Sequence, residues 1–146
     1  MYLQGENYME NIQDTGPNPL VVDIEQVTKD NQNYRTTLWT GNHLQITLMS
    51  IEPGKDIGLE VHQSVDQFLR IEEGEATVYF GTDQNNLDSQ KAEEDFAIVV
   101  PAGYWHNVVN TGEETLKIYS IYSPVQHPHG TVHKTKEEAE ASEHHS

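Results

Sequence analysis

Hydrophobic and polar residues alternate in short runs along the middle of the chain, which is the pattern of β-strands. In Leu44-Gln45-Ile46-Thr47-Leu48 the alternation is strict, as expected of a strand with one buried face. Turn signals such as Gly41-Asn42 and Pro53-Gly54 separate the runs. The strands predicted in this way cover residues 35–39, 44–51, 58–62, 68–71, 76–80, 96–100, 106–110 and 116–122. Many short antiparallel strands with almost no helix favour a sandwich or a closed barrel, because a closed barrel leaves no exposed edge.

The two ends of the chain depart from this pattern. Residues 1–19 are rich in Asn, Gln, Gly and Pro without apolar periodicity, so we expect a flexible arm there and regular structure from Leu20-Val21-Val22 onward. Near the other end, Thr135 and Glu138 have the spacing of a capping box and precede good helix formers, which predicts one short helix. The expected organisation is therefore an arm over 1–19, a barrel over 20–125, and a C-terminal arm with a short helix over 126–146.

Two segments about 35 residues apart carry the candidate chemistry. The apolar run 96–100 predicts a strand that is buried on both sides or forms part of a barrel wall. Pro101 and Gly103 end that strand in a sharp bend, and His106 then begins the next strand at the edge of the core. His62 lies directly before a hairpin that turns at Gly74.

These segments resemble the two sequence motifs of the cupin family. The second motif, Pro-x-Gly-x-x-His-x-x-x-Asn, is matched at Pro101, Gly103, His106 and Asn110, with Asp95 where a Gly usually opens it. The first motif is matched in part, because His62 and Gly74 are in register while Ser64 replaces the second His and Gln67 stands in place of the carboxylate. The resemblance implies an all-β fold, the double-stranded β-helix or jelly-roll barrel of cupins, here followed by a short C-terminal helix. Within the superfamily the chain is similar to the cupin domain of type II mannose-6-phosphate isomerases.

The resemblance also implies a metal site. In cupins the two motifs lie on neighbouring strands, so His62 and His106 are expected to point at one spot in the barrel mouth, where Gln67 completes the predicted ligand set. Neutral imidazole suits Zn, Mn, Fe, Ni or Co, whereas Gln offers only an uncharged carbonyl oxygen. Ser64 and Tyr104 are predicted to line the pocket, Ser64 because it follows His62 by two residues on one strand face. In the alternative, Ser64 and Gln67 form hydrogen bonds in a polar pocket that has lost its metal.

Two functions remain open on this evidence, because the cupin fold hosts enzymes and binding proteins alike. In the first, a divalent metal acts on a sugar or on a small carboxylate or carbonyl compound, in an isomerase- or dioxygenase-like reaction. In the second, the barrel binds a metabolite and carries out no chemistry.

The other histidines form a rival candidate. His127, His129 and His133 have a spacing that could hold a metal, but Pro128 breaks any helical face, and we expect this segment to be an arm that docks on the barrel or on a neighbouring subunit. His144 and His145 could bind nickel adventitiously.

Composition narrows the classes of partner. With 8 basic and 24 acidic residues the net charge is −16, which argues against nucleic acid and anionic membranes. There is no Cys, and no apolar run reaches the length of a signal-peptide core or a membrane span, so we expect a soluble, cytoplasmic protein. The apolar run at residues 20–22 and an open sheet edge predict a homodimer that binds a small-molecule ligand.

Overall fold

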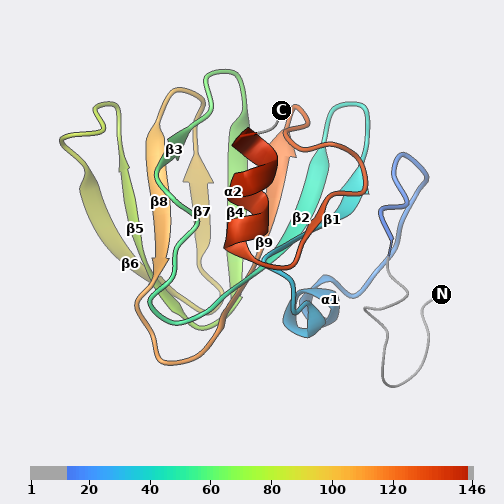
Figure 1. The fold of residues 1–146 in the computed structure, drawn as a ribbon, viewed down its shortest axis with the longest axis horizontal. Helices are drawn as coiled ribbons and strands as arrows, with labels where there is room; N and C mark the ends of the chain where they lie inside the picture. Colours follow the sequence, from blue (N-terminus) through green and yellow to red (C-terminus); the bar gives the residue numbers. More distant parts are fainter. Residues whose placement is uncertain (1–12, 145–146) are drawn as a thin grey trace.

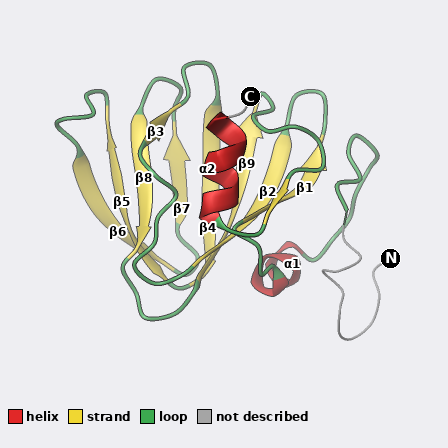
Figure 2. Ribbon diagram, in the orientation of Figure 1, coloured by secondary structure: helices red, strands yellow, loops and turns green. Residues whose placement is uncertain are grey.

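The computed structural model describes residues 13–144, which form a two-sheet β-barrel with a helix near each end of the chain (Figures 1 and 2). One sheet has the strand order β10-β1-β2-β9-β4-β7, and the other has the order β3-β8-β5-β6, with every neighbouring pair antiparallel. The elements are α1 Ile24–Asp30, β1 Arg35–Thr40, β2 Gln45–Ile51, β3 Glu60–Val61, β4 Asp66–Glu73, β5 Glu75–Gly81, β6 Asp88–Glu93, β7 Ala97–Val100, β8 Trp105–Asn110, β9 Leu116–Ser123, β10 Val132–His133 and α2 Lys136–His144. The predicted all-β fold with a short C-terminal helix is confirmed, and neither helix is long and apolar enough to cross a membrane.

Three elements were not predicted from the sequence. Helix α1 has only 7 residues; the side chain of Asp23 caps it, and Val27 packs on the outer face of the first sheet. Strand β6 is polar except for Ala92, which is its one buried residue, so it lacks the alternation that marks a strand. Strand β10 is two residues long and exists through its pairing with β1.

The expectations about two apolar runs were wrong, one in full and one in part. Residues 20–22 form no regular structure, and the side chain of Val21 is 96% exposed, because the chain only becomes regular at α1. For the run 96–100, the first alternative, burial on both sides, is wrong, whereas the second is met: Ile98 and Val100 face the core from the barrel wall, and Val99 is 68% exposed. The reason is that β7 is an edge strand, paired with β4 alone.

The interior of the barrel has an apolar end and a polar end. At the apolar end, Met49, Ile118 and Ile71 lie side by side on β2, β9 and β4, because the strand register pairs them directly. Val78 and Val108 face them from the second sheet. Four residues further along β9 and β4, the register instead pairs Tyr122 with Gln67. The apolar end therefore stabilises the barrel and leaves the polar end available for chemistry.

The C-terminal arm docks on the barrel, as the sequence predicted. The buried side chain of Gln45 accepts hydrogen bonds from the backbone N–H groups of Gln126 and His127 and donates to the carbonyl of His127. The His127 ring then meets the ring of Tyr122 edge-on, with the centroids 5.2 Å apart. Burial lowers the pKa of His127 to about 3, and the charge of Arg35 acts in the same direction.

Helix α2 follows this arm and closes the side of the barrel (Figure 2). The hydroxyl of Thr135 accepts the backbone N–H of Glu138, which confirms half of the predicted capping box. Ala139 is 2% exposed and belongs to the main core, and Lys136 forms an ion pair with Asp56. The helix is thus part of the barrel's packing.

Asn110 should be a main determinant of stability. Its amide nitrogen donates to the carbonyls of Ile51 and Glu114 at 2.8 and 2.9 Å, and its oxygen accepts the backbone N–H of Gly112. We predict that Asn110→Ala lowers the free energy of unfolding by about 3 kcal/mol, because each hydrogen bond contributes about 1 kcal/mol and a buried carbonyl is left unsatisfied. Urea denaturation checks this. The exposed neighbour Thr111→Ala is the control, and equal effects of both substitutions would contradict the assignment.

The partly buried ring of His127, whose Nε2 atom is buried, should make the fold sensitive to acid. Below pH 6.5 the unfolded chain binds a proton at this imidazole, whereas the folded chain does so only near pH 3, so the free energy of unfolding falls as the pH drops through this window. Between pH 6.5 and pH 5 the free energy of unfolding of the wild type should fall. In His127→Phe this fall should be smaller by about 1–2 kcal/mol, because the proton-binding imidazole is absent. Denaturation at both pH values measures this difference, with exposed His43→Phe as the control. Parallel pH profiles for the wild type and His127→Phe would contradict it.

Candidate metal centre

Glu60, His62 and His106 converge at the polar end of the barrel. Strands β3 and β8 place Glu60 directly opposite His106, and His62 lies two residues after Glu60. Oε1 of Glu60 is 3.3 Å from Nε2 of His62 and 3.5 Å from Nε2 of His106. All three potential ligand atoms lie within 4.8 Å of one another, and no other group of three His, Asp or Glu residues does so within residues 13–144.

The orientation of His106 leaves one ring nitrogen ready to bind. Its Nδ1 lies 3.3 Å from the backbone carbonyl of Tyr104, which can only accept, so we assign the proton to Nδ1. Nε2 is then a lone-pair donor, buried and without a hydrogen-bond partner, facing Glu60. Histidines that ligate metals are commonly held in this way, by a second N–H donated to a backbone carbonyl. The side chain is fully buried, so the ring is fixed by its surroundings.

Glu60 is ionised in this environment. Burial alone would raise the pKa of its carboxyl group, but the two imidazoles beside it, those of His106 and His62, outweigh burial and lower that pKa to about 2. The site therefore offers one negative oxygen and two imidazole nitrogens. Ligands of one ion at bond lengths of about 2.0–2.2 Å lie roughly 3–3.6 Å apart, which the two measured separations match. Two histidines and a carboxylate with open positions are the donor set of non-haem iron sites, so these residues fit a divalent transition metal.

The predicted ligands have different outcomes. The structure brings His62 and His106 together, with ring centroids 5.5 Å apart. Gln67 lies on β4 and is 2% exposed; its amide nitrogen donates to the hydroxyl of Ser120, and its oxygen is buried without a partner. A role for Gln67 as a ligand stays a prediction. Ser64 lies in an exposed bend, because β3 ends at Val61 and strand alternation does not continue to residue 64.

Sequence reasoning missed Glu60. The signal was present, because Glu60 and His62 are separated by one residue in a predicted strand and so share a face. The comparison with the usual motif directed attention to the position five residues after His62, where Gln67 stands. The carboxylate of this site comes instead from two residues before it.

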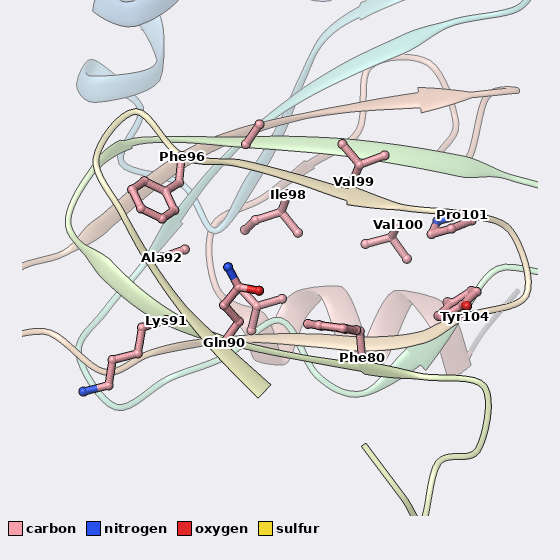
Figure 3. Close-up of a pocket in the computed structure, with 12 residues that line it drawn as sticks. Phe80, Gln90, Lys91, Ala92, Phe96, Ile98, Val99, Val100, Pro101 and Tyr104 are labelled. Carbon is pink, nitrogen blue, oxygen red and sulfur yellow. The ribbon is translucent and has the colours of Figure 1, made fainter. Parts of the chain in front are cut away.

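An apolar groove of about 350 Å³ lies between β6 and β7 (Figure 3). Phe80, Ile98 and Val100 project into it from opposite walls, and Tyr104 lies at one end. The register places Phe80 directly opposite His106 and Val100 directly opposite Gln67. Phe80 and Val100 therefore lie beside His106 and Gln67 on their sheets, and Tyr104 lines the groove. The place of Tyr104 in the pocket of the metal centre stays a prediction.

The C-terminal histidines do not form a comparable group. His127 packs on Tyr122, whereas Nε2 of His129 is 2.9 Å from the carbonyl of Gly16 and 3.3 Å from Asp14. Nδ1 of His133 lies 3.4 Å from the guanidinium of Arg35. Each imidazole thus has its own structural contact. The side chains of His144 and His145 lie outside the described residues.

Comparisons with known proteins agree with the fold. The family model described as a cupin domain matches residues 47–122, which is more than half of the chain. The chain is 56% identical over 133 residues to the uncharacterized protein YrkC of Bacillus subtilis, covering 90% of this chain and 72% of YrkC. It also superimposes on the crystal structure of BH2720 from Bacillus halodurans with a TM-score of 0.88 and 58% identity, covering 89% of this chain and 99% of BH2720.

A more distant structural match supports the fold alone. The structure of a predicted oxalate decarboxylase from Thermotoga maritima has a TM-score of 0.51 and 19% identity, and the match covers 57% of this chain and 69% of that protein. The assignment to a family rests on the family model and on the two relatives above. The matched residues 47–122 include the second motif at residues 101–110. The chain belongs to the cupin family.

Proposed function

We propose that the chain is a metal-dependent enzyme, in which Glu60, His62 and His106 hold a divalent transition metal and a small sugar or carboxylate or carbonyl compound binds beside it. The convergence of the three side chains carries this proposal, together with the buried, unpartnered Nε2 of His106. Zn, Mn, Fe, Ni and Co all accept this donor set. When bound, the metal would supply a Lewis acid or, with iron, a partner for dioxygen.

The residues of the chain have separate tasks in this proposal. The carboxylate of Glu60 offsets part of the charge of a divalent ion, and the carbonyl of Tyr104 keeps the His106 ring in its ligating orientation. The free Oε1 of Gln67 can serve as a neutral further ligand or accept a hydrogen bond from a hydroxyl of the substrate. The apolar groove binds the body of the substrate and keeps bulk water away from the ion.

The donor set favours the dioxygenase-like reaction over the isomerase-like one, because two histidines and one carboxylate leave adjacent positions open for dioxygen and substrate. The second candidate is a metabolite-binding barrel without chemistry. It is favoured by Gln67, which replaces an anionic ligand of the usual motif with a neutral group. Similarity to mannose-6-phosphate isomerases, the homodimer and the cytoplasmic location stay predictions.

The first prediction from this proposal concerns metal affinity. Glu60→Gln keeps the size of the side chain but removes its charge, so we expect the affinity for Co²⁺ and Zn²⁺ to fall more than about 100-fold, because even the outer-shell partners of metal ligands are worth 10–100-fold. Titration calorimetry measures this on protein shortened before His144, which excludes binding at the terminal histidines. Glu52→Gln, an exposed carboxylate on the barrel surface, is the matched control. Equal affinities of the two variants would contradict the ligand assignment.

A second prediction separates the enzyme from the binding protein. Protein reconstituted with Fe²⁺ under nitrogen should consume dioxygen when small carboxylates or carbonyl compounds are added with air. Oxygen uptake should disappear in His106→Ala, whose folding is checked by circular dichroism. Stoichiometric metal with no oxygen uptake and no isomerised product from any compound of these classes would favour the binding protein.

A further inference from the structure

Arg35 is a buried cation without an anionic partner. Its side chain is 5% exposed, and its Nε atom is buried without a hydrogen bond. Among residues 13–144, no Asp or Glu oxygen lies within 4.0 Å of its guanidinium. Its neighbours are Nδ1 of His133 at 3.4 Å and the ring of Tyr34, whose centroid is 5.3 Å from Cζ. Arg70, by contrast, lies at the surface and pairs with Asp95 at 2.8 Å.

The side chain of Arg35 belongs to the interior of the barrel. The register pairs Arg35 with Met49, which is 1% exposed and part of the main core, so both residues lie on the inner face. The hydroxyl of Tyr34 donates to the carbonyl of Ile57, and this contact joins the start of β1 to the segment that leads into β3. The same segment carries Glu60 of the metal centre, three residues after Ile57.

The ring of Tyr122 lies between the metal ligand His62 and the ring of His127, with which it has an edge-on contact on each side. The Tyr122 ring lies 6.1 Å from the ring of His62 and 5.2 Å from that of His127. Burial raises the pKa of Tyr122, the charge of Arg35 lowers it, and the charge of Glu60 raises it. The charge of Arg35 lowers the pKa of His127, and the charge of Glu60 raises it. Arg35, which pairs with the core residue Met49, and the fully buried His106 of the metal centre thus both lie in the interior of one barrel.

Charge and shape indicate what this space accepts. An ion buried without a partner costs several kcal/mol, so a site that retains one is suited to an anion that supplies the partner. A divalent ion at Glu60 would add positive charge to that of Arg35, whereas the chain as a whole carries −16. Attraction for an anion is therefore confined to this interior. The planar fork of a guanidinium matches the two oxygens of a carboxylate.

We propose that Arg35 binds a carboxylate of the ligand, which makes the substrate class of this barrel a small organic acid. The inference deepens the proposed function and rests on it for the position of the metal. A further buried atom without a partner, Nε2 of His127, belongs to the ring that packs on Tyr122 and can donate to or accept from the other end of such an acid.

Calorimetric titration with malonate tests the proposal, with neutral malonamide and inorganic phosphate as comparison probes. Metal-free and Zn²⁺-loaded forms of the full chain are both titrated. We expect malonate to bind and malonamide not to bind. Arg35→Met should weaken malonate binding by about 10- to 100-fold, and Arg35→Lys should weaken it less, because a charge remains without the fork. Phosphate bound as tightly as malonate would overturn the carboxylate assignment.

A thermal scan distinguishes a ligand-binding residue from a structural one. Without ligand, Arg35→Met should unfold at the same temperature as the wild type or higher, because it removes an unpaired buried charge. The matched comparison is Arg70→Met, which breaks existing ion pairs and should not be stabilised in this way. A midpoint for Arg35→Met more than about 5 °C below that of the wild type would show a structural role instead.

Zn²⁺ titration separates failure of this inference from failure of the proposed function. If the wild type and Arg35→Met bind Zn²⁺ equally and bind malonate equally, Arg35 does not recognise the ligand and the metal centre stands. If the wild type binds no Zn²⁺, the proposed function fails, while malonate binding to the metal-free protein that depends on Arg35 still supports the anion site. Absence of malonate binding in both forms overturns the inference.

Discussion

The pairing of β3 with β8 is the constraint on which the site depends. It is only two residues long, yet it places Glu60 opposite His106 and leaves His62 on the same side. A shift of this register by one residue would turn the carboxylate of Glu60 to the other face. Backbone hydrogen bonds on both sides fix the register, from the N–H of Ile57 to the carbonyl of Val108 and from the N–H of Gly103 to the carbonyl of His62. Gly103 reaches that position with φ of +87°, which a residue with a side chain rarely adopts.

The barrel can tolerate this polar site because its stability is concentrated elsewhere. The main core lies at the other end of the interior, and α1 closes a separate apolar cluster on the outer face of the first sheet. At the polar end, buried atoms of Gln67, His106 and His127 lack hydrogen-bond partners within the described chain, and the buried Nε of Arg35 lacks one elsewhere in the interior. Such groups are costly in a folded protein unless a ligand or water satisfies them. The unpartnered atoms of His106 and Gln67, in the part of the barrel that holds Glu60 and His62, are the physical reason to regard it as a binding site.

Much of this architecture could be predicted from the sequence, because alternation and turn residues mark each long strand. The short or polar elements could not be predicted: β6 has no apolar alternation, and β10 is a strand only through its contact with β1. His62 and His106 were identified because their motifs are local. Glu60 required knowledge of which strand pairs with β8, and Arg35 is hidden because β1 is buried on both faces and gives no alternating pattern. The residues that were missed could be identified only once it was known which strands pair with one another.

The central claim is that Glu60, His62 and His106 form one metal-binding unit. Anomalous X-ray scattering from crystals soaked in Co²⁺ tests it most directly, because it locates the ion without reference to activity. The account predicts a single strong anomalous peak in the barrel interior, about 2.0–2.2 Å from Oε1 of Glu60 and from Nε2 of both His62 and His106. A peak only at His127, His129 or His133, or no peak inside the barrel at saturating Co²⁺, would contradict it.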